Sequence, residues 1–382
     1  MSKRPRKESH EDDAEMRRRG CSPSPRTPGL VPWSHSANSP ARQRYLYLVL
    51  DDWQRGYSIH RLGEDDFKSD AGLDARAAEC PLVRVQAQHA YTCSFADHGS
   101  KILAMQPAGF SPGIPVLDTE TLEMTVYPFP KSRAVTGTSK LVHTSVGDRL
   151  VSFVFRYLEV LGPEPQPPVV ESSWSWSSPV EPFPPFDSSR VSSYALHPDG
   201  RTIFMSVEDW SVKPTSLAKR KRNSTYTLDT ERLEWTRLGD WLLPFKGRAH
   251  YDRELDAWVG ICLFKEGAGH LCCCDVPPAA GCRTMPAWKL GKDLLFDAAS
   301  IRHWGATLVY MGDSRFCLIE SRVAEDYDSD QRLRVLTMTS FGLKYDKVGE
   351  LMTSQYRAYA SMSYQTTHIQ PGHRLDPVAF WM

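Results

Sequence analysis

Short runs of β-branched, aromatic and aliphatic residues recur from Tyr45 onward, and groups of turn-forming residues separate them. Examples of these runs are YLYLVLD, TIFMSV, AWVGICLF and ATLVYMG. The stretches HPDG at 197–200 and YMGDSR at 310–315 are typical of hairpin turns. A helix-like stretch at 65–79 is short and has no sustained apolar face. The pattern therefore predicts a chain built almost entirely of β-strands.

One hairpin signature returns at a fixed interval. The segments VLDTETLEM and TLDTERLEW place Asp118 and Asp229 111 residues apart, and KYDKVGEL places Asp346 117 residues further on. In each segment the aspartate can accept a hydrogen bond from the backbone N–H two residues later, which closes the turn. A regular recurrence of hairpins is typical of blades or solenoids rather than of unrelated strands.

The hairpins divide the chain into similar units. Their predicted bounds are 45–85, 89–130, 140–186, 191–240, 247–292 and 303–352. We therefore expect an all-β fold, a β-propeller of about six blades with four antiparallel strands each, with five or seven blades still open. The first strand, YLYLVLD, and the last, PVAFWM at 377–382, are expected to pair and close the ring. A β-sandwich fits less well, because one sandwich commonly needs only about 100 residues.

A proline-rich segment at 162–187 interrupts the pattern and contains Trp174 and Trp176. Because WSW alternates as a strand does, we interpret the segment as a loop leading into the outer strand of the third blade. The alternative is a polyproline II ligand for an aromatic groove.

The first 44 residues differ in composition from the rest. They are rich in Pro, Ser and charge, so we expect a disordered basic tail at 1–44 and the propeller domain at 45–382. The tail has ten Lys or Arg against five Asp or Glu, whereas the whole chain has 46 of each. The beginning of the sequence lacks the apolar stretch of a secretory signal peptide, and no apolar run approaches the ~18–20 residues of a membrane span. With an odd count of nine cysteines, this predicts reduced thiols and an intracellular address, nucleus or cytoplasm, with no membrane partner.

Catalytic fingerprints are absent from the sequence. It contains no G-x-S-x-G, H-E-x-x-H, P-loop or G-x-G-x-x-G motif. His270, Cys272 and Cys274 could share a strand face, but no C-x-x-C accompanies them, so buried thiols are the better interpretation. The histidines His89, His143, His250 and His303 are interpreted as single turn or strand-edge residues, not as a ligand set. We accordingly expect no catalytic residues, no metal site and no cofactor.

Two basic runs could be recognised by a nuclear importer, which needs an extended and exposed cationic peptide. The candidate residues in the tail are Lys3, Arg4, Arg6, Lys7, Arg17, Arg18 and Arg19. A second run, expected in a loop, comprises Lys219, Arg220, Lys221 and Arg222. Nucleic-acid binding is not favoured, because that run contains no aromatic residues and the chain outside the tail has more acidic than basic residues.

Several longer strings resemble a known family. These strings are YLYLVLDDW at 45–53, DWLLPFKGRAHYDRELDAWVG at 240–260, GATLVYMGDSRFCLIE at 305–320, FGLKYDK at 341–347 and PVAFWM. They are similar to an uncharacterised plant family, expanded in grasses, of the domain of unknown function 1668 type. The resemblance implies a kelch-like propeller without an established activity. LDTERLEW is similar to part of a kelch repeat, although the chain lacks the Gly-Gly dipeptide of that signature. Plant kelch-like proteins often carry an amino-terminal F-box for ubiquitin-ligase assembly. Here the expected disordered tail has that position, so a role as a ligase adaptor loses its usual support.

The sequence therefore favours a non-catalytic scaffold that presents loops to a protein or peptide partner. Two alternatives stay open. One is a propeller-type enzyme with an active site at the end of the central channel. The other is a nuclear accessory protein that uses its basic tail.

Overall fold

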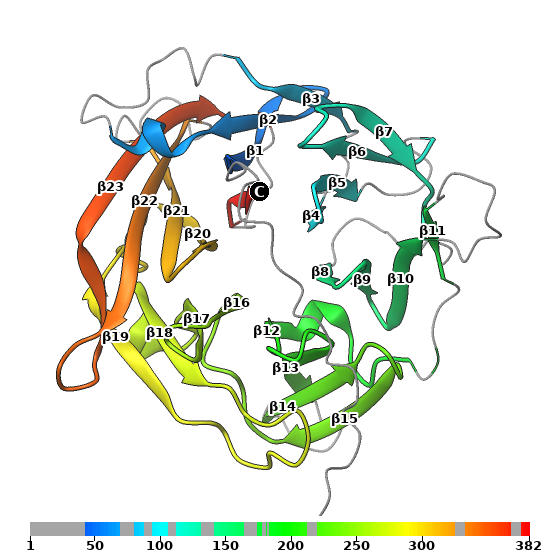
Figure 1. Ribbon diagram of the computed structural model, residues 1–382, viewed down its shortest axis with the longest axis vertical. Coiled ribbons are helices and arrows are strands. Elements are labelled where there is room, and N and C mark those ends of the chain that lie inside the picture. Colours follow the sequence, from blue (N-terminus) through cyan, green and yellow to red (C-terminus); the bar gives the residue numbers. More distant parts are fainter. Residues whose placement is uncertain are drawn as a thin grey trace, which may run out of the picture. The chain divides into compact units, whose positions relative to one another are not determined.

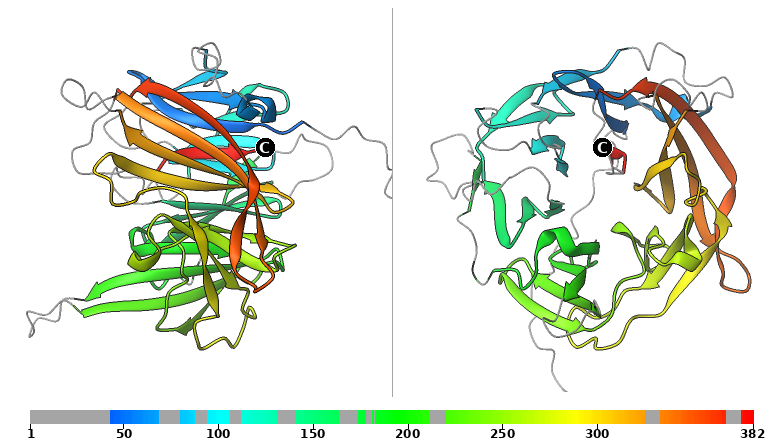
Figure 2. Two further views of the ribbon diagram at one scale, coloured as in Figure 1. Left: turned by 90° about the vertical axis from the view of Figure 1, so that its left-hand side faces the viewer. Right: turned by 180° about the vertical axis from the view of Figure 1, so that it is seen from behind.

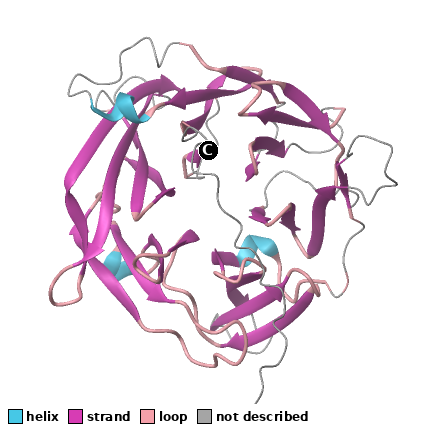
Figure 3. Ribbon diagram, viewed as in Figure 1, coloured by secondary structure: helices cyan, strands magenta, loops and turns pink. Residues whose placement is uncertain are grey.

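The computed structural model describes residues 43–68, 80–87, 94–105, 112–130, 141–163, 174–177, 181, 183–211, 220–324, 333–367 and 376–382. Residues 44–382 form one compact unit. The predicted disorder of the tail lies outside the described residues. The alternating runs of the sequence form 24 strands in the described ranges, where the helical segments are three short 3-10 turns (Figure 3). These turns are η1 (Glu64–Lys68), η2 (Ser188–Arg190) and η3 (Lys265–Gly267).

The strands fall into groups of four, and consecutive strands pair as antiparallel hairpins. The first sheet contains, from the centre outward, β24 (Val378–Trp381), β1 (Leu46–Trp53), β2 (Gly56–Leu62) and β3 (Val83–Gln86). The second contains β4 (Ser94–His98), β5 (Lys101–Met105), β6 (Ile114–Asp118) and β7 (Met124–Tyr127). The third contains β8 (Val142–Val146), β9 (Arg149–Val154), β10 (Tyr157–Pro163) and β11 (Trp174–Trp176).

The second half of the unit repeats this organisation. The fourth sheet contains β12 (Val191–Leu196), β13 (Thr202–Ser211), β14 (Arg220–Asp229) and β15 (Glu234–Gly239). The fifth contains β16 (Gly247–Asp252), β17 (Ala257–Ile261), β18 (His270–Asp275) and β19 (Trp288–Leu294). The sixth contains β20 (His303–Gly312), β21 (Arg315–Val323), β22 (Leu333–Tyr345) and β23 (Leu351–Gln365). A parallel pairing of β12 with β16 joins the fourth and fifth sheets through their inner strands.

The sheets stand around a common centre in a propeller-like arrangement, with the first strand of each group, or β24 in the first sheet, nearest the middle (Figure 1). The predicted pairing of the terminal strands is confirmed. Leu46 lies opposite Trp381 and Val49 lies opposite Val378. Outside the strands, the backbone N–H of Tyr45 donates to the carbonyl of Met382 at 2.8 Å, and that of Met382 donates back at 3.0 Å. The first and last described strands therefore belong to one sheet.

The core is distributed between the sheets. In the described ranges, six hydrophobic clusters each join two consecutive sheets, and one of them joins the sixth sheet to the first. In that cluster Leu48 of β1 packs with Ile319 of β21 and Met338 of β22, all three essentially inaccessible to solvent. Because apolar side chains on both faces of each sheet are buried against a neighbour, every sheet is stabilised by the two beside it.

Two sequence expectations need correction at the level of elements. The sixth unit extends to Gln365 rather than 352, because β22 and β23 form an unusually long hairpin. Arg220, Lys221 and Arg222 belong to β14 and not to a loop, while Lys219 lies outside the described residues. The pairing places Arg222 opposite Asp209 in β13. The backbone pairing of β13 with β14 therefore continues into the polar run.

Candidate functional site

Aspartates close the outer hairpins of three alternate sheets, as the repeat predicts. The carboxylate of Asp118 accepts the backbone N–H of Glu120 at 2.9 Å, and that of Asp229 accepts the N–H of Glu231 at 3.0 Å. Asp346 accepts the N–H of Val348 at 2.9 Å in the sixth sheet. The predicted contact, from the N–H two residues after each aspartate, is confirmed in all three turns.

Each of the first two turns is also bound to the inner hairpin of its own sheet. The hydroxyl of Thr119 donates to the carbonyl of Ser100 at 2.8 Å, and that of Thr230 donates to the carbonyl of Arg201 at 2.7 Å. Leu122 and Leu233 complete these turns with φ values of 60° and 59°, a left-handed conformation that non-glycine residues seldom adopt. The same sequence pattern, Asp-Thr-Glu-x-Leu, therefore builds the same turn in the second and fourth sheets.

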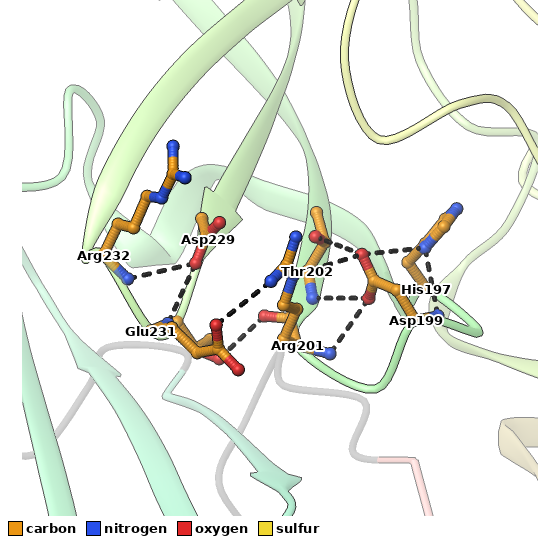
Figure 4. Close-up of polar contacts among 8 residues, drawn as sticks. His197, Asp199, Arg201, Thr202, Asp229, Glu231 and Arg232 are labelled. Atoms are coloured by element: carbon orange, nitrogen blue, oxygen red, sulfur yellow. Dashed lines mark hydrogen bonds and ion pairs between the residues drawn. The ribbon is translucent and has the colours of Figure 1, made fainter. Parts of the chain in front are cut away.

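Figure 4 shows this linkage in the fourth sheet, where the inner hairpin carries His197, Asp199 and Arg201. Asp199 accepts the backbone N–H of Arg201 and the N–H and hydroxyl of Thr202, with its Oδ2 2.6 Å from that hydroxyl. Partial burial alone would raise the pKa of Asp199, but these hydrogen bonds hold it below its ordinary value. Arg201 extends from the inner hairpin to Glu231 of the outer one, at 3.1 Å.

Contacts between sheets place their turns at the same end. The hydroxyl of Ser314, in the inner hairpin of the sixth sheet, donates to Asp252 of the fifth at 2.8 Å. The guanidinium of Arg315 forms an ion pair with Glu64, which lies in η1 between β2 and β3 of the first sheet, at 3.1 Å. In the second and third sheets, His98 and Ser145 are joined at 2.7 Å. We call this end the turn face. The left view of Figure 2 shows the sheets from the side. The turn face comprises residues 97–101, 118–123, 146–149, 197–201, 229–234, 252–256, 312–315 and 346–350.

A second polar group lies among the inner strands. Arg248 of β16 forms an ion pair with Asp97 of β4, with 3.2 Å between the guanidinium nitrogen and the carboxylate oxygen. These strands belong to the fifth and second sheets, which face each other across the centre in Figure 1. Both side chains keep about a third of their surface accessible, 34% and 31% respectively. The ion pair therefore connects opposite sides of the arrangement through its middle.

Tyr194 and His250 complete what we call the central group, with Asp97 and Arg248. Tyr194 lies opposite Arg248 in the parallel pairing of β12 with β16, and burial raises its pKa. His250 bonds through Nε2 to the carbonyl of Leu308 at 3.1 Å. Burial and the nearby Arg248 lower the pKa of His250 to about 3, so its ring is neutral at physiological pH. The neutral ring donates to Leu308, and the ion pair carries the formal charges of the group.

The histidines and cysteines singled out in the sequence have separate environments. His143 lies between the hydroxyls of Ser94 and Ser152, at 3.1 and 2.9 Å, and burial lowers its pKa to about 4. His303 pairs with Glu320 at 3.1 Å. His143 is the second residue of β8 and His303 is the first residue of β20, so both lie near strand ends. His89 lies outside the described residues. In the part of the chain that the structure describes, no group of three or more His, Cys, Asp or Glu could hold a metal ion.

The cysteines of β18 are buried, as the strand pattern predicts. Cys272 and Cys274 pack between the fourth and fifth sheets, whereas Cys273 packs between the fifth and sixth. Burial raises the pKa of the Cys272 and Cys274 thiols, so both are protonated at neutral pH. These three cysteines are therefore part of the hydrophobic core.

The structure leaves the candidate import signal untested. Lys3, Arg4, Arg6, Lys7, Arg17, Arg18 and Arg19 lie outside the described residues. The sequence reasoning named His250 but did not predict that it lies with Asp97, Tyr194 and Arg248 in the central group. Asp97 and Arg248 are 151 residues apart, and nothing in their local sequence signals that they meet. No helix in the described ranges is long and apolar enough to cross a membrane.

Residues 43–360 match the family described as "Protein of unknown function (DUF1668)", which is most of the chain. The chain belongs to this family. No curated protein matches the sequence. The family description assigns no activity that could be compared with the turn face or the central group.

Among solved structures, the fold is similar to hydrazine synthase of Kuenenia stuttgartiensis. The identity is 12%, the match covers 71% of this chain and 69% of that one, and the TM-score is 0.34. It is also similar to a chain of the nidogen/laminin complex, at 11% identity, with 85% of this chain and 100% of that chain covered and a TM-score of 0.38.

Proposed function

We propose that this protein is a kelch-like β-propeller of six blades, closed by its terminal strands, that acts as a non-catalytic scaffold inside the cell. In this proposal the turn face binds a protein or peptide partner. The observation that carries it is the anchoring of the turns, because Asp118, Asp229 and Asp346 each hold a hairpin by hydrogen bonds. Loops held in one conformation lose little entropy on binding, so they suit recognition.

The turn face also offers exposed charged side chains that are free to vary without disturbing the core. Arg232, Arg253 and Lys347 are exposed there and belong to the fourth, fifth and sixth sheets. They can contact a partner that spans several sheets. A rim of exposed charge governs the association rate and the choice of partner more than it governs fold stability.

Affinity purification with the tagged full chain tests this proposal. We expect the triple variant R232E/R253E/K347E to lose a partner that the unmodified chain captures. A control, R55E/R156E, reverses two exposed charges in hairpins 53–56 and 154–157, at the opposite end of the strands, and should retain it. Equal capture by the two variants would overturn the turn face as the binding site. Thermal unfolding of both variants checks that the fold is unchanged.

The central group favours a second candidate, a propeller-type enzyme or ligand-binding protein whose site lies at the middle. Asp97, Tyr194, Arg248 and His250 converge there from three sheets. The ion pair already neutralises the carboxylate and the guanidinium, which is why we rank this candidate below the scaffold. If Arg248→Gln abolished capture and the triple turn-face variant retained it, that ranking would be reversed.

For the basic tail we propose nuclear import through Lys3, Arg4, Arg6, Lys7, Arg17, Arg18 and Arg19. An importer binds such residues by complementary charge, so their replacement by glutamine should lower the nuclear-to-cytoplasmic ratio of the fluorescently tagged full chain. An unchanged ratio would contradict the proposal. A nuclear accessory role on nucleic acid would require salt-dependent binding that disappears without residues 1–44.

A further inference from the structure

A cavity of about 400 Å³ lies between the fifth and sixth sheets, away from the central group. The segment that connects β19 to β20 forms one wall, and side chains of β21, β22 and β23 form the other. These elements neighbour one another on the left of Figure 1. The volume is within the range of ~300–1,000 Å³ found for small-molecule sites.

The polar side chains of this cavity are held in place before any ligand arrives. Glu320, 9% exposed, lies 3.1 Å from His303 through one oxygen and 3.7 Å from the Nε of Arg322 through the other. Arg322 also donates to the hydroxyl of Thr337 at 3.2 Å. The guanidinium is therefore fixed at two points, and a ligand that bonds to it loses less side-chain entropy.

The charges lining the cavity balance one another. Asp297 and Glu320 supply two carboxylates, and Arg302 and Arg322 supply two guanidinium groups. A ligand with a net charge would meet as many repulsive groups as attractive ones. A neutral ligand with many hydroxyl groups instead donates to the carboxylates and accepts from the guanidinium groups at the same time.

An aromatic ring supplies an apolar surface at the same place. Tyr359 of β23 lines the cavity and is 53% exposed, although it is a large aromatic residue. Its ring can cover the apolar C–H face of a sugar while its hydroxyl stays in water. We propose that this cavity binds a neutral saccharide, with Arg322 and Glu320 bonding to the hydroxyl groups and Tyr359 packing on the ring. This site is independent of partner binding at the turn face.

Saturation-transfer NMR and calorimetry with the full chain, using maltose, cellobiose and sucrose as probes, test the proposal. We expect saturable binding of at least one of these disaccharides. Tyr359→Ala should weaken it about tenfold through loss of the aromatic contact. Thr337→Val, which removes one anchor of Arg322, should also weaken it. Tyr157→Ala, a matched change of an exposed tyrosine in the third sheet, should leave it unchanged.

Three outcomes would overturn the proposal. The first is no saturable binding of any of the three sugars by the folded chain. The second is sugar binding that Tyr359→Ala and Thr337→Val leave unchanged. The third is displacement of the sugar by inorganic phosphate, which would assign the cavity to an anion. Thermal unfolding of each variant, compared with that of the unmodified chain, separates loss of binding from loss of fold.

Discussion

Individual turn residues act through several contacts at once. Asp118 accepts backbone N–H groups of its own turn, and it also forms a 2.7 Å ion pair with Lys101 of the neighbouring strand. The first contact follows from sequence, because aspartate commonly bonds to the N–H two residues later. The second does not, because the position opposite Asp118 depends on the length of the hairpin between β5 and β6. Local chemistry is therefore easier to predict than the pairing of residues across strands.

Replacing Asp118 should separate these contributions. We expect Asp118→Ala to lower the free energy of unfolding at pH 7 by about 1–2 kcal/mol, because it removes the ion pair and the turn hydrogen bonds together. Asp118→Asn keeps an acceptor oxygen for the turn and should lose less. Chemical denaturation measures both, with the exposed Glu123→Gln as the control.

The same variants should respond to pH in a defined direction. Partial burial would raise the pKa of Asp118, but the bonds from Lys101 and Glu120 lower it below its ordinary 3.8. A depressed folded pKa gives stability that is present above the unfolded value and is lost as pH falls through the folded value. The difference in free energy of unfolding between the unmodified chain and Asp118→Asn should therefore shrink as the pH falls from neutral to below 3.8. A difference that stays constant over this range would show that the charge of Asp118 contributes nothing.

At the scale of elements, hydrophobic alternation located the strands but not their ends. The WSW segment is the outer strand of the third sheet, β11, as its alternation predicts. The hairpin of β13 and β14 continues through Arg220–Arg222, where the sequence shows only a basic run. Alternation reports burial, whereas a strand continues for as long as backbone groups find partners. Polar extensions such as this one, and the long hairpin of β22 and β23, therefore escape prediction.

The parallel pairing of β12 with β16 also escapes prediction from the sequence. Ser193 lies opposite Gly247 and Ala195 opposite Ala249, so two inner strands pair across a boundary between sheets. Gly247 has a φ of 75°, which L side chains rarely adopt, and a Cβ there would meet no atom within 4 Å, so the glycine serves the backbone conformation. The sequence marks these residues as small but does not say which inner strands meet. That information comes from the position of whole sheets around the centre.

At the scale of the whole molecule, the sheets are held together from two directions. Clusters of apolar side chains join each sheet to its neighbours, including Leu48 and Ile319 between the first and sixth. The ion pair of Asp97 and Arg248 joins the second sheet to the fifth across the middle. Repetition in the sequence predicts the first kind of contact, because every unit has two apolar faces. It cannot predict the second, because the pair occurs once and belongs to no repeat.

A double-mutant cycle should show whether this ion pair couples opposite sheets. We expect Arg248→Gln and Asp97→Asn each to lower the free energy of unfolding by about 1–2 kcal/mol, since each leaves the opposite charge without its partner. The double variant should lose about 1 kcal/mol less than the sum of the single variants. The exposed pair of Arg201 and Glu231 has a similar separation, 3.1 Å, but lies within one sheet at the turn face. Its cycle, from Arg201→Gln and Glu231→Gln, should give a coupling of at most about 0.5 kcal/mol. Additive effects at the centre would instead mean that the apolar clusters alone hold the sheets in position.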